Sequence, residues 1–74
     1  MEELKEIMAK ILEHTNYEDE TSLMTDGKID SIELVELVAE IEEHFQIEIP
    51  LDEMVPENFD SIQEIWNMIQ KLRG

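Results

Sequence analysis

The middle of the chain constrains the fold most, because it combines a turn, a helix start and a long helix. Asp26-Gly27 predicts a turn, since glycine accepts the positive φ that other residues resist. Asp30 is typical of an N-cap, and Glu33 three residues later completes a capping box. Ser31 is therefore predicted at the first helical position, with its hydroxyl exposed at the positive end of the helix dipole, where an added phosphate would be favoured.

The helix predicted from Ser31 to Phe45 carries two apolar stripes on opposite sides. At about 100° per residue, the first stripe contains Leu34, Leu37, Val38, Ile41 and Phe45. The second contains Ile32, Val35 and Ala39 and runs among Glu33, Glu36, Glu40 and Glu43. Because a small domain can bury only one face of a helix completely, we predict that the first stripe is core and the second is a docking surface. The alternative is that loops cover Ile32 and Val35.

Helical spacing of apolar residues predicts two further long helices. The first covers residues 2–13, and the last follows a cap at Asp60 or Ser61, with a core stripe of Ile62, Ile65, Trp66 and Ile69. Residues 15–29 form a long connection anchored by Leu23 and Ile29, residues 46–50 are extended, and short turns follow, one with Pro56 at its N1 position. The predicted fold is all-α: an irregular four-helix bundle with three long helices, one short helix and a long first loop.

Length and charge limit the class of protein. A chain of 74 residues suits one domain, residues 1–74, with one core. We find no signal peptide and no long apolar run, so we expect a soluble protein in the cytoplasm, or in an organelle matrix if the chain is a mature form, with no membrane insertion. The net charge of −15 argues against nucleic acid and anionic membranes, and for basic protein partners or cations. We expect a monomer.

Two kinds of chemistry are possible around Ser31. The stretch from Asp26 to Glu33 matches the second half of an EF-hand calcium loop, but the first and third ligand positions fall on Ser22 and Met24, and a thioether does not bind a hard cation. A small acidic calcium-binding protein is therefore the alternative function, and we assign no metal ligands. The chain has no cysteine and no motif that joins a histidine to Ser31, which makes Ser31 a substrate of another enzyme rather than a catalytic residue. We expect no enzymatic activity.

The chain resembles the acyl carrier protein family. The resemblance rests on the sequence GKIDSIELVEL at residues 27–37 and EEHFQIEIP at residues 42–50, together with the chain length, the helix order, the long first loop and the FDSI entry to the last helix. It implies a 4′-phosphopantetheine arm on Ser31, next to Asp30, transferred from coenzyme A by a phosphopantetheinyl transferase. The thiol of the arm would carry acyl, aminoacyl or polyketide intermediates as thioesters and present them to partner enzymes.

The resemblance also implies two groups of site residues. Basic acyl-transferring or synthase enzymes would dock on the helix after the serine, at Ile32, Glu33, Val35, Glu36, Ala39, Glu42 and Glu43. The acyl chain would enter the core among Leu37, Val38, Ile41, Ile49, Ile62 and Ile65. Housekeeping fatty-acid carriers usually read Gly-Ala-Asp-Ser-Leu-Asp before this helix, whereas this chain has Asp-Gly-Lys-Ile-Asp-Ser-Ile-Glu at residues 26–33. The difference favours a specialised member of the family and leaves the cargo open.

Overall fold

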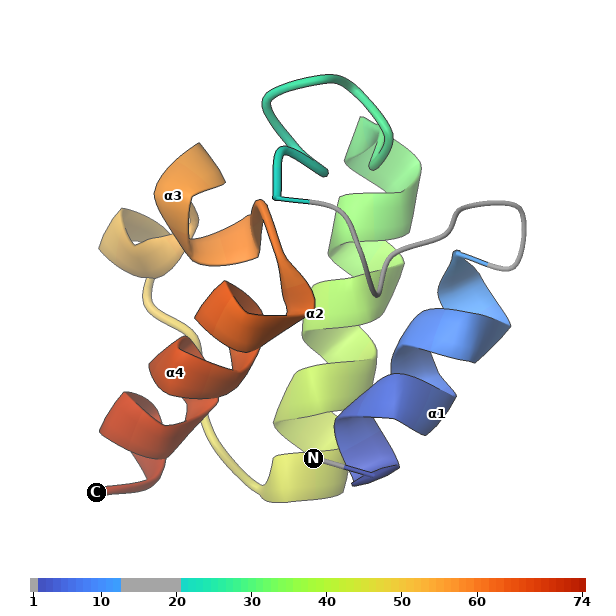
Figure 1. Cartoon of the computed structure of the whole chain (residues 1–74). Coiled ribbons are helices and arrows are strands. Elements are labelled where there is room, and N and C mark those ends of the chain that lie inside the picture. The colour runs from blue at the N-terminus through green and yellow to red at the C-terminus, as the bar shows by residue number, and fades with distance from the viewer. Residues whose placement is uncertain (1, 13–20) are drawn as a thin grey trace.

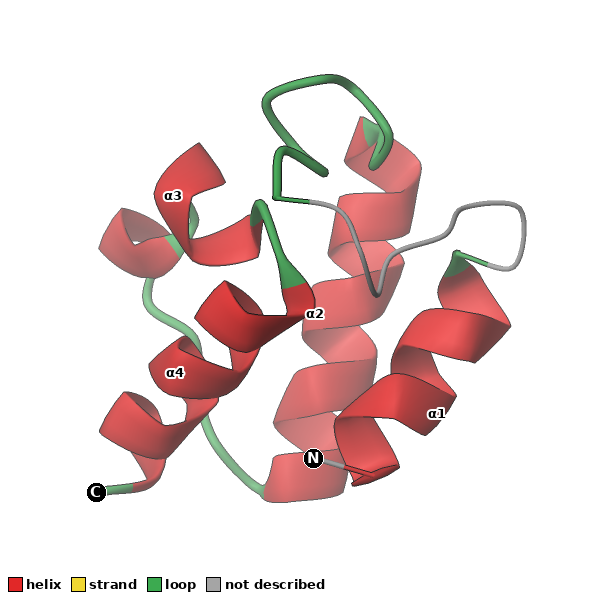
Figure 2. Cartoon of the chain, in the orientation of Figure 1, coloured by secondary structure: helices red, strands yellow, loops and turns green. Residues whose placement is uncertain are grey.

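A computed structural model describes residues 2–12 and 21–74 of the chain. The regular elements in this part are all helical: α1 (Glu2–Ile11), α2 (Ser31–Phe45), the 3₁₀ helix η1 (Leu51–Glu53), α3 (Pro56–Phe59) and α4 (Ile62–Arg73). In Figure 1, α2 lies behind α1 and α4, and the short α3 lies above α4. Figure 2 shows the described loops between helices and no strand in the described ranges. The predicted irregular four-helix bundle is confirmed.

The start and end of α2 follow from its own sequence. Asp30 has an extended backbone (φ −85°, ψ 177°), and its Oδ1 accepts the amide of Glu33 at 2.8 Å. The carboxylate of Glu33 in turn accepts the amide of Asp30 at 3.2 Å, which completes the predicted capping box. The helix ends at Gln46, whose left-handed backbone (φ 57°) directs its amide to the carbonyl of Glu42.

One continuous core holds the helices together. Its buried apolar side chains are Leu4, Ile7, Met8, Leu12, Leu23, Ile29, Leu37, Val38, Ile41, Ile49, Phe59, Ile62, Ile65, Met68 and Ile69. Leu34 and Phe45, the other two members of the predicted core stripe of α2, are half-buried and pack against this cluster. The predicted assignment of the two faces of α2 is therefore confirmed on its core side.

The first and last helices differ in detail from the prediction. α1 ends at Ile11, although the amide of Leu12 still bonds to the carbonyl of Met8 at 2.7 Å. Residue 13, the last of the predicted helix, lies outside the described residues. In α4, Met68 is buried where Trp66 was expected. The reason is that Trp66 lies at the edge of the stripe, where its ring meets Phe45 edge-on with centroids 6.1 Å apart.

The segment between α2 and α4 has the predicted sequence of turns. Ile49 is buried in the extended chain before Pro50, and Pro56 begins α3 at its N1 position. Ser61 caps α4 by accepting the amide of Glu64 at 3.1 Å. No described helix is both long enough and apolar enough to cross a lipid bilayer.

Candidate functional site

Ser31 has an environment that the other two serines of the chain lack. It is exposed at the first position of α2, and its side chain makes no hydrogen bond with any other described residue. Ser22 and Ser61 are half-buried, and the hydroxyl oxygen of Ser61 already accepts the amide of Glu64. A phosphodiester on Ser31 would therefore face solvent at the positive end of a helix of 15 residues. The arrangement fits a covalently attached phosphate group.

The loop before Ser31 is closed by its own backbone. The carbonyl of Leu23 accepts the amides of Lys28 at 2.8 Å and Ile29 at 3.1 Å, and the amide of Gly27 bonds to the carbonyl of Met24. Gly27 has the positive φ (75°) that the predicted turn required. Leu23 and Ile29 are both buried, so the two predicted anchors of this loop are confirmed.

Asp60 also holds this loop, and the sequence did not reveal that role. Its Oδ1 accepts the amides of Met24 at 3.1 Å and Thr25 at 2.8 Å, and its Oδ2 accepts the Thr25 hydroxyl at 2.8 Å. The hydrogen bond from the Thr25 amide is the main cause that lowers the pKa of Asp60, and the Thr25 hydroxyl and the Met24 amide contribute. The sequence offered Asp60 only as one of two candidate caps for α4, and the structure shows that Ser61 is the cap.

The second apolar stripe of α2 is exposed. Ile32 and Val35 keep 71% and 65% of their surface accessible, and Ala39 is exposed between them and the end of the helix. The alternative that loops cover Ile32 and Val35 is therefore wrong. Glu36 and Glu43 are exposed on the same side of α2, so the face is apolar along its middle and acidic at its rim.

Glu33 and Glu42 differ from the other residues predicted to meet partners, because both carboxylates already bond to backbone. Glu33 belongs to the capping box, and the Oε2 of Glu42 accepts the amide of Ile49 at 2.8 Å. Both residues are half-buried. Glu42 stabilises the turn that follows α2. Its carbonyl accepts the amides of Gln46 and Ile47, and its carboxylate accepts the amide of Ile49.

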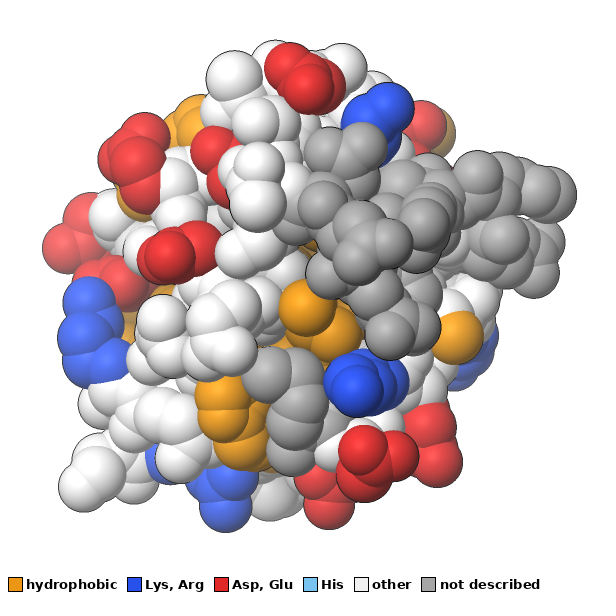
Figure 3. Space-filling model, in the orientation of Figure 1, with side chains coloured by type: hydrophobic (Ala, Val, Ile, Leu, Met, Phe, Trp, Pro, Cys, Tyr) orange, Lys and Arg blue, Asp and Glu red, His pale blue; other side chains and the backbone are white. Residues whose placement is uncertain are grey.

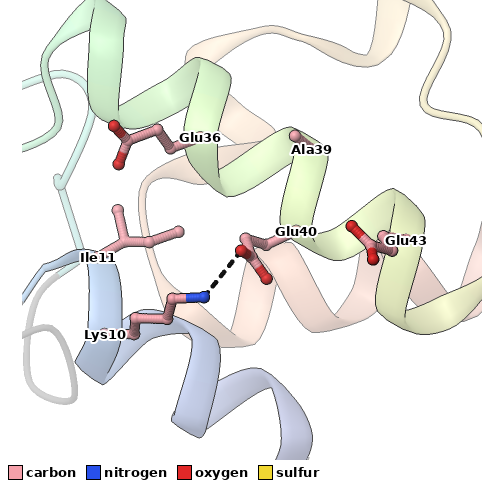
Figure 4. A pocket seen from close by; sticks show the side chains of 6 residues that line it. All are labelled: Lys10, Ile11, Glu36, Ala39, Glu40 and Glu43. Atoms are coloured by element: carbon pink, nitrogen blue, oxygen red, sulfur yellow. Dashed lines mark hydrogen bonds and ion pairs between the residues drawn. The ribbon is translucent and has the colours of Figure 1, made fainter.

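A groove between α1 and α2 continues the exposed face of α2 toward α1. Its volume is about 260 Å³, and Figure 4 shows the lining side chains of Lys10, Ile11, Glu36, Ala39, Glu40 and Glu43. The ammonium of Lys10 lies 2.8 Å from a carboxylate oxygen of Glu40, and this hydrogen bond is the main cause that raises the pKa of Lys10. Acidic side chains extend beyond α2: they also lie around the edge of the face shown in Figure 3.

The six residues predicted to receive an acyl chain come together in the core. Leu37, Val38 and Ile41 reach it from α2, Ile62 and Ile65 from α4, and Ile49 from the chain between them, and all six are buried in one cluster. They pack with the other core side chains, whereas the open groove lies on the α1 side of α2. A chain that entered here would have to separate side chains that are in contact.

The structure gives no support to the calcium alternative. The carboxylates of Asp30 and Glu33, two of the acidic side chains in the calcium-loop match, each use one oxygen to accept the amide of the other residue. Within residues 2–12 and 21–74, no group of three or more His, Cys, Asp or Glu side chains is placed to hold a metal ion.

Comparison with known proteins agrees with this site. The family model described as "Phosphopantetheine attachment site" matches residues 2–69. The chain is 30% identical to the D-alanyl carrier protein of Streptococcus mutans, over 97% of this chain and 98% of that protein. It is 43% identical to the acyl carrier protein of Campylobacter concisus, over 72% of this chain and 66% of that protein. It is 42% identical to that of Buchnera aphidicola, over 72% and 65%. No solved structure matches.

The chain therefore belongs to the family of phosphopantetheine-bearing carrier proteins. The cofactor of this family is 4′-phosphopantetheine, which is attached covalently. The resemblance stated from residues 27–37 and 42–50 is confirmed at the level of the family.

Proposed function

We propose that residues 1–74 form a single carrier domain, without catalytic activity of its own, that bears phosphopantetheine on Ser31. The observation that carries the proposal is the contrast among the serines: Ser31 alone of the three is exposed, and it begins a capped helix. When bound, the arm supplies a thiol that forms thioesters, a chemistry that the cysteine-free chain lacks.

The chain contributes a nucleophilic oxygen and a favourable electric field to the attachment. The Ser31 Oγ forms the new bond to phosphorus, the adenosine bisphosphate part of coenzyme A leaves, and the hydroxyl proton passes to a base on the transferase. The positive end of α2 stabilises the diester charge beside it. Asp30 has a supporting role, because its carboxylate fixes the start of the helix and hence the position of Ser31.

The partners that fit this surface are enzymes with a basic, partly apolar docking site. These would be the phosphopantetheinyl transferase and the enzymes that load or use the cargo. Ile32, Val35 and Ala39 supply the apolar part of the contact, and Glu36 and Glu43 supply its acidic rim. A net charge of −15 would speed the approach of basic partners and oppose self-association, which supports a monomer. We place this monomer in the cytoplasm as part of the same proposal.

We propose that the cargo is an acyl, aminoacyl or polyketide group of a specialised pathway, and that it is not limited to the intermediates of housekeeping fatty acid synthesis. Two observations support a specialised carrier: the sequence before α2 departs from the housekeeping pattern, and a relative named D-alanyl carrier protein aligns over nearly the whole chain. Loading of the modified protein with D-alanine by an amino-acid-activating ligase, compared with loading of fatty acids by an acyl synthetase, separates these cargoes.

The attachment itself is tested by intact-protein mass after incubation with coenzyme A and a broad-specificity transferase. We expect the wild type to gain one phosphopantetheine and Ser31→Ala to gain none. Ser61→Ala is the matched control, because it removes a serine that also lies at the start of a helix, and it should gain one arm like the wild type. Modification of Ser31→Ala, or none in the wild type with several transferases, would contradict the proposal.

A further inference from the structure

Asp60 connects the beginning of α4 with the loop that leads to Ser31. Three consecutive amides, those of Leu23, Met24 and Thr25, donate to this one residue, the first to its carbonyl at 2.8 Å and the other two to its carboxylate. The Thr25 hydroxyl adds a fourth contact. Figure 1 shows the loop before α2 next to the junction of α3 and α4. Asp60 thus acts on the loop as a helix cap would, although it lies 35 positions from Thr25.

Hydrogen bonds continue from Asp60 to the start of α2. Leu23 gives its amide to Asp60 and receives the amides of Lys28 and Ile29 on its carbonyl, so the two ends of the loop meet at Leu23. Ile29 directly precedes Asp30, which caps α2. The neighbouring Phe59, which is fully buried, anchors Asp60 in the fold.

Holding the loop is the distinguishing role of Asp60, since α4 does not need it as a cap. The hydroxyl of Ser61 already accepts the amide that a cap of α4 would take. A carboxylate that accepts backbone amides forms stronger hydrogen bonds than a neutral acceptor. The residues that this contact keeps in place, Thr25 to Lys28, are exposed and lie just before Ser31 in the chain.

We propose that Asp60 is a positioning residue for the modification of Ser31: it holds the loop of residues 23–29 in the shape that a phosphopantetheinyl transferase binds beside the serine. The inference rests on the proposed function. Without the Asp60 carboxylate the loop would sample more conformations. Binding of the transferase would then have to order the loop, and this cost would lower the affinity of the transferase for the carrier. The hydroxyl of Ser31 and the cap of α2 would be unchanged, so the chemical step would keep its rate.

The test is the steady-state kinetics of phosphopantetheine transfer, measured by mass while the concentration of the unmodified carrier is varied. For Asp60→Ala we expect kcat/KM to fall about tenfold, through a higher KM for the carrier with little change in kcat. Asp60→Asn keeps one oxygen acceptor for the amides and should restore part of the loss. Thr25→Val removes the hydroxyl contact alone and should raise KM by a smaller factor, about twofold to threefold.

Ser61→Ala is the control for a merely structural effect. It removes the adjacent cap of α4 and destabilises the fold without touching the loop, so its KM should stay at the wild-type value. The inference would be overturned if KM stayed unchanged in both Asp60→Ala and Thr25→Val. It would also be overturned if KM rose in Ser61→Ala as much as in Asp60→Ala. If the wild type is modified and KM does not respond, this inference alone fails; if the wild type accepts no arm, the proposed function fails with it.

Discussion

The two faces of α2 can be separated by making the same substitution on each. Ile32 and Ile41 belong to the same helix, but Ile32 is 71% exposed and Ile41 is fully buried. We expect Ile41→Ala to destabilise the fold and Ile32→Ala to leave the stability nearly unchanged while it weakens docking. Because the chemical change is identical, the difference between the variants reports the environment of each side chain.

The magnitudes follow from burial. Truncating a buried isoleucine to alanine costs about 2–5 kcal/mol, from the lost transfer free energy and the cavity left behind. A domain of this size has a total stability of about 4–11 kcal/mol, so Ile41→Ala should remove a large part of it. At the exposed Ile32 the change should stay within about 0.5 kcal/mol, because alanine has the higher helix propensity and little contact is lost.

Urea unfolding followed by the fluorescence of Trp66 measures both variants, since this half-buried ring rests against Phe45 at the end of α2. In the transferase assay, Ile32→Ala should lower kcat/KM roughly five- to tenfold, because it removes an apolar contact of the proposed docking surface. A loss of more than about 1.5 kcal/mol of stability in Ile32→Ala would refute the reasoning, because a side chain that exposed cannot contribute so much to the fold.

Three further predictions concern the acidic residues: the hydrogen bond of Glu42, the hydrogen bonds of Asp60 and the net charge of the chain. Glu42→Ala should destabilise the fold by about 1–3 kcal/mol in urea unfolding, because it leaves the amide of Ile49 without its acceptor, whereas Glu43→Ala, with an exposed carboxylate, should have little effect. The carboxylate of Asp60 has a lowered pKa in the folded state, so its contribution is complete above the unfolded-state pKa of about 3.9 and is lost as the pH falls through the folded-state pKa. The difference in unfolding free energy between the wild type and Asp60→Asn should therefore shrink on acidification below about pH 4, and a constant difference would argue against the contact. Added salt or divalent cations should raise the melting temperature, since they screen a net charge of −15, and an unchanged melting temperature would contradict this.

The elements that the sequence predicted well are those whose signals are local. The start of α2 needed only Asp30 and Glu33, three residues apart, and its two faces needed only the helical period. Pro56 and Ser61 marked the starts of α3 and α4 in the same way. Ser31 could therefore be placed at an exposed helix start from the sequence alone.

The features that the sequence did not reveal depend on contacts between distant residues. Asp60 bonds to residues 35 and 36 positions away, and no local pattern indicates such a pairing. Glu42 lies at the margin of the exposed face by helical period, and only the turn after α2 brings the amide of Ile49 to its carboxylate. The exchange of Trp66 for Met68 in the core depends on which edge of α4 faces Phe45, and this is set by packing.

The central claim is that Ser31 bears the arm, and it is tested most directly by locating the modification within the chain. Trypsin releases residues 29–71 as one peptide, in which Ser31 and Ser61 are the only side chains with a hydroxyl group. Fragmentation of this peptide from the protein treated with coenzyme A and transferase should place phosphopantetheine on Ser31. An arm on Ser61, or on any residue outside this peptide, would contradict the account.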